Sequence, residues 1–185
     1  MRNILLVLSG PSGVGKGTIA KKLVEQNPDI ALSVSCTTRL PREGEVDGKD
    51  YFFVTKDYFE KKINEDGFLE YSNHFENYYG TPKDFVLDKL NTNDVLLEID
   101  VNGGLNVKKS FSDAILIMVL PPSVEEVKNR LMKRHTESPE NIELRMQRIK
   151  YEISKQTLYD YSVVNDDLDE TVKQLENIIK NEKNK

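Results

Sequence analysis

Apolar residues gather in short runs along this chain, and helix-like segments separate the runs. The runs at residues 4–8 and 115–120 are unbroken, which is typical of a strand buried in a parallel sheet. The runs span residues 4–8, 95–99, 115–120 and 162–164. Residues 19–25 and 169–179 show helical spacing between or after them. Strands that alternate with helices predict an α/β fold with a parallel sheet.

Hydroxyl side chains mark the expected helix starts. Ser123 has a glutamate three residues later, which is the spacing of a capping box. Thr81 and Ser138 each stand directly before a proline, an arrangement typical of an N-cap followed by the first helical residue. These signals predict helices that begin near residues 82, 124 and 139.

Residues 34–83 interrupt the alternation of strands and helices. This segment holds most of the aromatic residues, and residues 51–54 and 68–75 alternate as short antiparallel strands do. We expect a parallel-sheet core with a small mixed or antiparallel insert and a further helical segment. The predicted core comprises residues 1–33, 84–124 and 151–185, the insert residues 34–83 and the helical segment residues 125–150.

The composition is that of a globular protein. The chain has 185 residues, of which 38% are hydrophobic and 31% charged. Its longest apolar run, residues 114–120, is far shorter than the roughly 20 residues of a membrane span. The N-terminal apolar stretch runs directly into a glycine loop and does not read as a signal peptide. We therefore expect a cytoplasmic protein without a membrane partner.

Cysteine content and net charge exclude several kinds of site and partner. The single Cys36 excludes an intramolecular disulfide and a cysteine-based metal site, which agrees with a reducing compartment. The net charge of −5 argues against a general nucleic-acid-binding protein. A small anionic substrate is compatible with that charge, because it needs only local positive charge.

The most specific local motif is GPSGVGKGT at residues 10–18, between the first strand and the first helix. Glycines allow a tight turn in which backbone N–H groups face phosphate oxygens, and the helix N-terminus adds a positive dipole. A plain turn has no need of Lys16, which suits the β- and γ-phosphates of a nucleoside triphosphate. The expected nucleotide-binding residues here are Gly10, Ser12, Gly13, Val14, Gly15, Lys16, Gly17 and Thr18.

The loop departs from the usual phosphate-loop pattern in one place. That pattern has Ser or Thr directly after the lysine, where the hydroxyl binds Mg²⁺. Here Gly17 follows the lysine and the hydroxyl comes one residue later, on Thr18. We therefore expect Thr18 to act on a metal only indirectly, through phosphate or a bound water.

A second anion site is predicted downstream of the loop. Arg39 and Arg42 flank a proline and form a rigid pair whose planar donors suit phosphate. The alternative for these arginines is a surface ion pair with Glu43 or Glu45. The loop indicates a nucleoside triphosphate, and the arginines indicate a second phosphate-bearing substrate.

Taken together, these motifs resemble the guanylate kinase family. The matching segments run from about residue 4 to residue 170, and the middle ones are far more specific than the phosphate loop. They read GPSGVGKGT, SVSCTTRLPREGEVDGKDYFF, GFLEYSNHFENYYGTP, LLEIDVNG, LPPSVEEVKNRL and YSVVNDDLDE. The resemblance implies a P-loop kinase core, a GMP-binding subdomain at residues 34–83 and a lid at residues 125–150.

The resemblance also implies the residues that bind GMP. Its phosphate would contact Arg39, Arg42, Tyr51 and Tyr79, and its guanine would contact Ser35, Glu70 and Thr81. A carboxylate such as Glu70 accepts both N1–H and N2–H of guanine, and adenine does not present this pair. Without the resemblance, Glu70 is equally well interpreted as a solvated carboxylate on a strand. Tyr51 and Tyr79 are then interpreted as packing residues.

Acidic residues and lid arginines complete the implied site. Glu98 and Asp100 stand at the end of an apolar run, on one face of the expected strand. The resemblance implies that they act near Mg²⁺ and GMP, with Asp100 as an indirect metal ligand. The implied catalytic residues are Lys16, Arg39, Arg130, Arg134 and Arg145, and Asn165 is implied near the adenine. Arg148 departs from the family motif and receives no role. Taken alone, such arginines are usually a solvated helix face.

The expected reaction transfers the γ-phosphoryl group of ATP to GMP, and to dGMP, with Mg²⁺. It needs no general base, because a GMP phosphate oxygen is already nucleophilic at neutral pH. The alternatives are a kinase for AMP or dTMP, a guanylate-kinase-like module that binds phosphorylated peptides, and a GTPase, whose N-K-x-D motif is absent. ATP and GMP are the expected partners of a monomer or small homo-oligomer.

Overall fold

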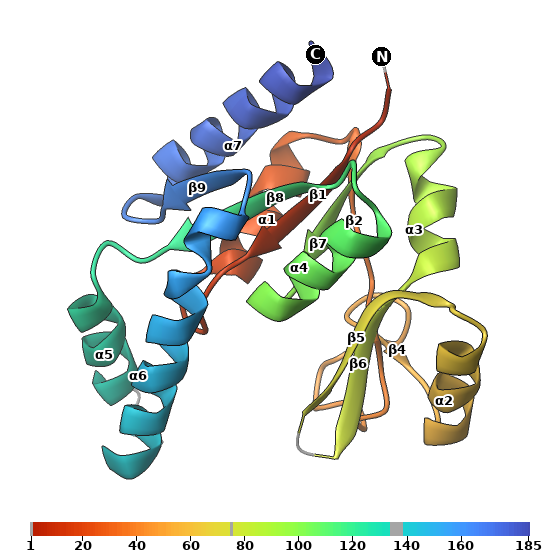
Figure 1. The fold of residues 1–185 in the computed structure, drawn as a ribbon, viewed down its shortest axis with the longest axis horizontal. Helices are drawn as coiled ribbons and strands as arrows, with labels where there is room; N and C mark the ends of the chain where they lie inside the picture. The colour runs from red at the N-terminus through yellow and green to blue at the C-terminus, as the bar shows by residue number, and fades with distance from the viewer. Residues whose placement is uncertain (1, 75, 134–138) are drawn as a thin grey trace.

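A computed structural model describes residues 2–74, 76–133 and 139–185. It contains a central parallel sheet and a smaller second sheet, joined and covered by helices (Figure 1). The central sheet has the strand order β2-β7-β1-β8-β9, and all neighbouring strands in it are parallel. Its strands are β1 (Leu5–Ser9), β2 (Ile30–Leu32), β7 (Asp94–Glu98), β8 (Ile115–Leu120) and β9 (Tyr161–Val164). The expected α/β fold is confirmed.

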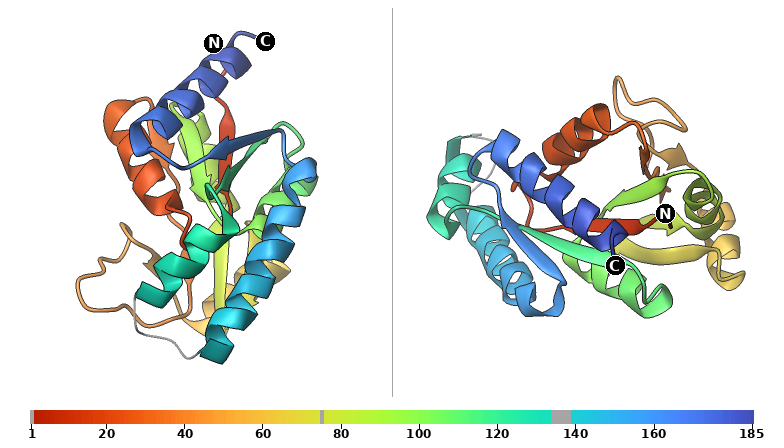
Figure 2. Two further views of the ribbon diagram at one scale, coloured as in Figure 1. Left: turned by 90° about the vertical axis from the view of Figure 1, so that its left-hand side faces the viewer. Right: turned by 90° about the horizontal axis from the view of Figure 1, so that it is seen from above.

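Helices cover both faces of this sheet, as Figure 2 shows. The helices are α1 (Lys16–Gln26), α2 (Lys56–Asn64), α3 (Lys83–Leu90), α4 (Val101–Ser110), α5 (Val124–Lys133), α6 (Pro139–Ser154) and α7 (Leu168–Lys183), with a short 3₁₀ turn at Gln156–Leu158. Leu6 and Leu8 of β1 pack with residues of α1 and α7. Leu5 and Val7 point the other way and pack with residues of α3 and α4. Burial on both faces explains why β1 is a continuous apolar run up to Ser9.

The second sheet lies in the segment between β2 and α3. Its strands are β3 (Cys36–Thr37), β4 (Phe52–Phe53), β5 (Phe68–His74) and β6 (Asn77–Pro82), in the order β4-β3-β6-β5. The β3–β4 pair is parallel and the other two pairs are antiparallel, so the insert is mixed. A separate small core supports it, in which Phe59 of α2 stacks against Phe68 and Tyr78 with ring centroids 4.3 and 5.0 Å away.

Cys36 lies in this small core and is a buried free thiol. Burial raises the pKa of the thiol to about 11, so the reactive thiolate is scarce at neutral pH. Among the described residues, no helix is long and apolar enough to cross a membrane.

Some local expectations are confirmed and others are wrong. The hydroxyl of Ser123 accepts a hydrogen bond from the backbone N–H of Glu126 at 3.1 Å, as an N-cap does. The expected cap at Thr81 is wrong: Pro82 still belongs to β6, α3 begins at Lys83, and the Thr81 hydroxyl bonds a side chain of the neighbouring strand instead. The helix expected after Ser138 begins at Pro139, and Ser138 itself lies outside the described residues.

Candidate active site

The glycine-rich loop, residues 10–18, connects β1 to α1 at the C-terminal end of the central strand. Gly10 has a φ of +154°, and a Cβ atom there would lie 2.3 Å from the carbonyl oxygen of Val119 in β8. Gly15 is the N-cap of α1 with a φ of +98°. Glycine is therefore required at both ends of the turn that presents the helix N-terminus to a phosphate.

The Lys16 ammonium is folded onto the loop itself. It donates hydrogen bonds to the carbonyl oxygens of Gly10 at 2.7 Å and Pro11 at 3.2 Å. Burial lowers the pKa of Lys16, and the charges of Glu98, Glu152 and Asp100 act in the opposite direction. The ammonium is thus partly dehydrated and held by neutral carbonyls, which phosphate oxygens would replace favourably.

The other predicted loop residues differ in exposure. Ser12, Gly13, Gly17 and Thr18 are exposed, so they are open to a ligand. The side chain of Val14 is fully buried in the core, so only its backbone could meet a phosphate.

Asn165 stabilises the glycine-rich loop by a hydrogen bond to its backbone. It follows β9, and its side-chain amide donates a hydrogen bond of 2.7 Å to the carbonyl oxygen of Val14. Its Nδ2 atom lies 2.7 Å from the place that a Cβ on Gly15 would take. The residue predicted near adenine therefore also fixes the loop conformation.

Gly17 lies beside the carboxylate of Glu98. A Cβ atom at this position would lie 3.5 Å from Oε2 and 3.6 Å from Oε1 of Glu98, which ends β7. Mg²⁺ in nucleotide sites is typically held by one or two carboxylates, water and phosphate oxygens. Glu98 therefore supplies a carboxylate beside the phosphate loop that suits a magnesium ion, and Thr18 supplies an exposed hydroxyl one residue after Gly17.

Asp100 has a different position from the one its spacing predicted. The strand ends at Glu98, so the two acids do not share a strand face. Asp100 is the N-cap of α4 and accepts a hydrogen bond of 2.7 Å from the backbone N–H of Gly103. Its carboxylate acts electrostatically on both Lys16 and Glu70, so it lies between the phosphate loop and the second sheet.

Arg39 is held in a compact cluster on the second sheet. Its two terminal nitrogens bond the two carboxylate oxygens of Glu45, both at 2.9 Å. The guanidinium also lies over the ring of Tyr51 at 5.5 Å, and it bonds the side chain of Tyr79. Glu45 further accepts a bond of 2.7 Å from the backbone N–H of Arg42. The structure thus brings four predicted phosphate-binding residues together, with Glu45 organising them.

The sequence had offered Glu45 only as the partner in a surface ion pair. Its hydrogen bond with Arg39 lowers the pKa of the Glu45 carboxyl, which keeps that group ionised at neutral pH. The side chain of Arg39 is only 15% exposed, so the pair is not an ordinary surface contact.

Glu70 is a buried carboxylate on β5. Thr81, directly opposite on β6, donates its hydroxyl to Oε1 of Glu70 at 2.7 Å. Burial raises the pKa of Glu70 to about 7, and the bond from Thr81 opposes that rise. Oε2 lies 3.0 Å from the place of a Cβ on Gly103, so Glu70 lies against the start of α4. Ser35, half-buried before β3, is the third predicted guanine contact.

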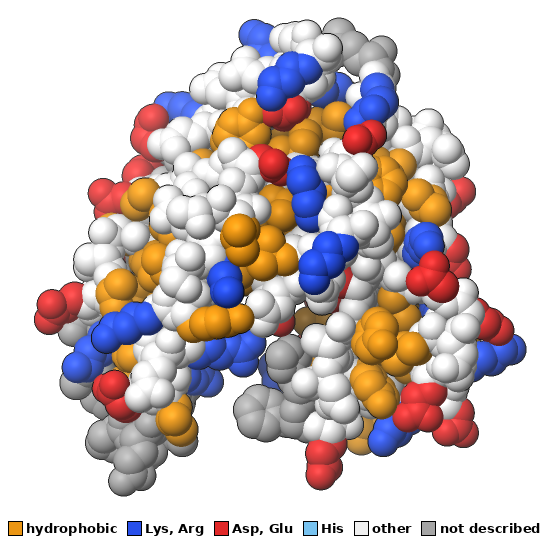
Figure 3. Space-filling model, in the orientation of Figure 1, with side chains coloured by type: hydrophobic (Ala, Val, Ile, Leu, Met, Phe, Trp, Pro, Cys, Tyr) orange, Lys and Arg blue, Asp and Glu red, His pale blue; other side chains and the backbone are white. Residues whose placement is uncertain are grey.

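The predicted lid arginines are only partly described. Arg145 is exposed on α6, whereas Arg130 belongs to α5 and Arg134 lies outside the described residues. Figure 3 shows that the molecule is hollowed between the α5–α6 pair and the second sheet, with Lys and Arg side chains on the helical side. Phosphates bound at the glycine-rich loop would therefore face positive charge across this hollow.

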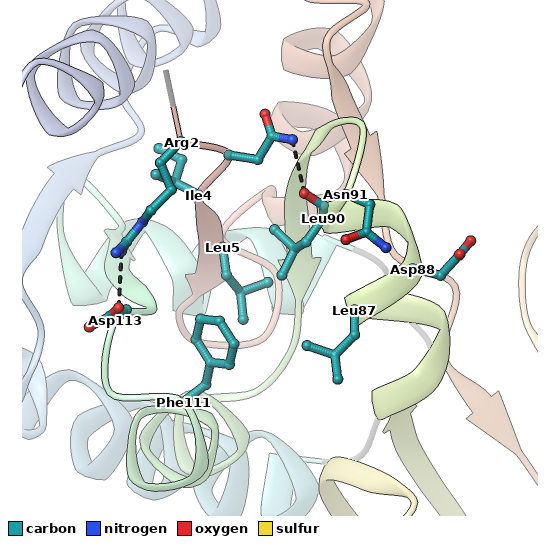
Figure 4. Close-up of a pocket in the computed structure, with 10 residues that line it drawn as sticks. Arg2, Ile4, Leu5, Leu87, Asp88, Leu90, Asn91, Phe111 and Asp113 are labelled. Atoms are coloured by element: carbon teal, nitrogen blue, oxygen red, sulfur yellow. Dashed lines mark hydrogen bonds and ion pairs between the residues drawn. The ribbon is translucent and has the colours of Figure 1, made fainter.

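Another cavity, of about 460 Å³, has no part in this arrangement (Figure 4). It lies where β1 begins, whereas the glycine-rich loop follows the other end of this strand. An exposed ion pair between Arg2 and Asp113 crosses its rim at 3.1 Å.

Comparisons with known proteins identify the family. The family model described as guanylate kinase matches residues 2–182. A guanylate kinase of Caldanaerobacter subterraneus subsp. tengcongensis is 50% identical over 183 residues, which are 98% of this chain and 89% of the relative. A guanylate kinase of Clostridioides difficile is 48% identical over 100% of this chain and 90% of the relative.

A solved structure agrees with these relatives. The crystal structure of guanylate kinase from Anaplasma phagocytophilum superposes with a TM-score of 0.79 at 33% identity, covering 98% of this chain and 86% of that chain. Sequence and structure therefore place this chain in the guanylate kinase family of nucleoside monophosphate kinases.

Proposed function

We propose that the protein transfers the γ-phosphoryl group of ATP to GMP and releases ADP and GDP. One observation carries this proposal: the carboxylates of Glu70 and Asp100 lie side by side at the start of α4, 3.0 and 3.4 Å from the Cβ position of Gly103, and Asp100 follows Glu98, whose carboxylate lies beside Gly17 of the phosphate loop. A carboxylate pocket suited to guanine and a triphosphate site thus lie at neighbouring positions. Such an arrangement brings a donor and an acceptor nucleotide within reach of direct transfer.

Recognition of the base rests on Glu70. When ionised, its two oxygens accept N1–H and N2–H of guanine, while Thr81 fixes the orientation of the carboxylate. AMP would leave this buried carboxylate unpaired, which is the kind of mismatch that gives strong discrimination. Ser35 would donate to guanine O6, because the single hydroxyl hydrogen of Thr81 is already donated to Glu70.

The cluster around Arg39 would hold the phosphate of GMP. Arg39 and Arg42 supply charge, and Tyr51 and Tyr79 supply hydroxyl donors. An oxygen of this phosphate attacks the γ-phosphorus in line, the bond from that phosphorus to the β–γ bridging oxygen breaks, and the electron pair leaves with ADP. No proton has to be removed first.

Positive charge stabilises the loose transition state of this reaction. Lys16, Arg130, Arg134 and Arg145 would surround the phosphoryl group in transit. Mg²⁺, held through Glu98 and through water by Thr18 and Asp100, would neutralise the β- and γ-phosphates. Closure of the lid and of the second sheet would exclude water, which otherwise hydrolyses ATP.

The wider setting is part of the proposal. A single buried thiol suits the reducing cytoplasm, where we expect the enzyme to act. ATP and GMP are its expected small-molecule partners, and we expect a monomer or a small homo-oligomer.

The test is ADP release from ATP and Mg²⁺ with GMP, dGMP, AMP, CMP, UMP or dTMP, and without an acceptor. Lys16→Ala, run in parallel, controls for a contaminating kinase. Turnover with GMP and dGMP that is lost in this variant is the expected result. Turnover with another base contradicts the role of Glu70. A folded protein without any turnover contradicts the proposed function and favours a phosphopeptide-binding module.

A further inference from the structure

Glu152 is a buried carboxylate that the roles assigned above do not include. It lies on α6 and is only 6% exposed. Its Oε1 atom accepts a hydrogen bond of 3.1 Å from Nε of Arg148, and its Oε2 atom is buried without a hydrogen-bond partner among the described residues. A half-satisfied buried carboxylate costs free energy of folding. Folding stability alone therefore does not explain why a carboxylate is placed here.

The position of Glu152 points to the phosphate loop. Arg145, Arg148 and Glu152 share one face of α6, because they are spaced by three and four residues. The charges of Arg148 and Glu152 both act on Lys16, and the charge of Glu152 also acts on Tyr159. The Tyr159 hydroxyl in turn donates to the carbonyl oxygen of Val101, directly after Asp100. This face of α6 is therefore turned toward the site.

Arg148 is fixed by one side of its guanidinium group, and its terminal nitrogens are positioned to bind a phosphate. Only its Nε atom bonds Glu152, and in the described part of the chain neither terminal nitrogen has a partner. The side chain is 53% exposed, so these terminal nitrogens are open to a ligand. Holding a guanidinium by one edge leaves its other donors free for bidentate contact with phosphate oxygens.

Charge repulsion supports the same interpretation. The positive charge of Arg148 opposes the charge of Lys16 and favours its neutral form, more weakly than burial does. This repulsion is relieved when an anion lies between the two cations. A triphosphate supplies that anion, and Glu152 supplies a smaller counter-charge that fixes Arg148 in place.

We propose that Arg148 is a further catalytic arginine, which contacts the phosphoryl group in transit, and that Glu152 is its positioning residue. The inference rests on the proposed phosphoryl transfer from ATP to GMP. Arg148 moves no proton in this step; it stabilises the charge that builds up as the bond to ADP breaks.

The first test compares Arg148→Gln with Lys150→Gln, a matched control at an exposed position on the same helix. Arg148→Gln should lower kcat by about 10²-fold, with KM for ATP and GMP changed less than about threefold, because the contact forms mainly in the transition state. Lys150→Gln should keep the kcat of the unaltered enzyme. An unchanged kcat in Arg148→Gln overturns the proposal.

A second readout separates catalysis from structure. The affinity for a transition-state mimic, ADP with aluminium fluoride and GMP, should fall in parallel with kcat in Arg148→Gln, while the affinity for ADP alone stays the same. A lower melting temperature with unchanged affinity for the mimic would mean that the Arg148–Glu152 pair is merely structural.

The double variant tests the role of Glu152. Glu152→Gln should lower kcat, and Arg148→Gln/Glu152→Gln should be no slower than Arg148→Gln, because Glu152 acts through Arg148. A clearly slower double variant overturns the positioning role; if Glu152→Gln does not fold, the Arg148→Gln results decide. An unaltered enzyme that does not phosphorylate GMP refutes the proposed function and this inference together, whereas equal turnover in Arg148→Gln refutes this inference alone.

Discussion

At the scale of single residues, the buried Glu70 gives the clearest link between fold and chemistry. Its pKa of about 7 lies within the range in which an enzyme works, so its charge changes with modest changes in pH. The ionised form presents the two acceptors that guanine needs, whereas the protonated form has turned one of them into a donor. The affinity for GMP should therefore follow the ionisation of this one carboxyl.

We expect KM for GMP to rise about tenfold from pH 8 to pH 6, because the ionised fraction of a group with this pKa falls by that factor. Steady-state kinetics at fixed Mg²⁺ and ATP measure it. In Glu70→Gln, KM should be higher throughout and should keep only the pH dependence of the GMP phosphate. Equal pH profiles for both proteins would contradict the assignment.

The same raised pKa affects folding stability with a defined sign. A carboxyl that binds its proton more tightly when folded stabilises the native state at low pH, and this contribution is lost as pH rises toward about 7. In urea unfolding of the ligand-free protein, the contribution of Glu70 to the free energy of unfolding should therefore fall from about pH 4.5 to pH 7. Glu70→Gln should remove this part of the pH dependence of the free energy of unfolding. An unchanged pH dependence in this variant would contradict the raised pKa of Glu70.

At the scale of elements, the phosphate loop depends on a close approach between strands. Gly10→Ala would place a methyl group 2.3 Å from the backbone of β8, which cannot move aside easily. Gly13, also at positive φ, has nothing within 4 Å of its Cβ position. Gly13→Ala should cost about 1–2 kcal/mol from backbone strain alone, and Gly10→Ala about 3 kcal/mol or more. Urea unfolding measures both; equal losses would contradict the steric argument.

The brace from Asn165 makes a further prediction at this scale. Asn165→Ala removes the hydrogen bond to Val14, and such a bond contributes about 1 kcal/mol. KM for ATP should rise about two- to tenfold, while KM for GMP stays the same. Asp166→Ala, at the exposed neighbouring position, serves as the control. A change in KM for GMP alone would show that Asn165 does not act on the loop.

Most of the elements could be predicted from apolar periodicity, but the shortest ones could not. Long buried strands such as β8 leave continuous apolar runs. By contrast, β2 spans only Ile30–Leu32, and β3 and β4 have two residues each, too few for any period to show. Thr81 was misread as a helix cap because sequence spacing cannot reveal a partner on another strand. Glu152 was missed because an Arg–Glu pair four residues apart on a helix reads as a solvent-exposed pair, and only the packing of α6 shows that Glu152 is buried.

At the scale of the whole molecule, the strand order explains why the site forms where it does. The central β1 lies between β7 and β8, so the phosphate loop, Glu98 and Asn165 meet beyond the carboxyl ends of adjacent strands. The second sheet and the α5–α6 pair extend on either side of this edge (Figure 1). We expect both to approach the core when the two nucleotides bind, so that their phosphates can meet.

Substrate binding should therefore make the molecule more compact. Small-angle scattering should show a smaller radius of gyration with GMP and a non-hydrolysable ATP analogue together than with either nucleotide alone. Lys16→Ala mixed with both nucleotides provides a control with a weakened ATP site. An unchanged radius with both nucleotides bound would contradict closure.

Because Cys36 is buried, we expect its thiol to react slowly with oxidants and alkylating reagents. The only thiol of the chain lies among aromatic rings, and its high pKa keeps it protonated. Cysteines introduced at exposed positions on α2 and α6 would therefore take up a fluorescent dye selectively, with Cys36 left in place. The enzyme is thus a convenient natural background for following the movement of its parts by site-specific labelling.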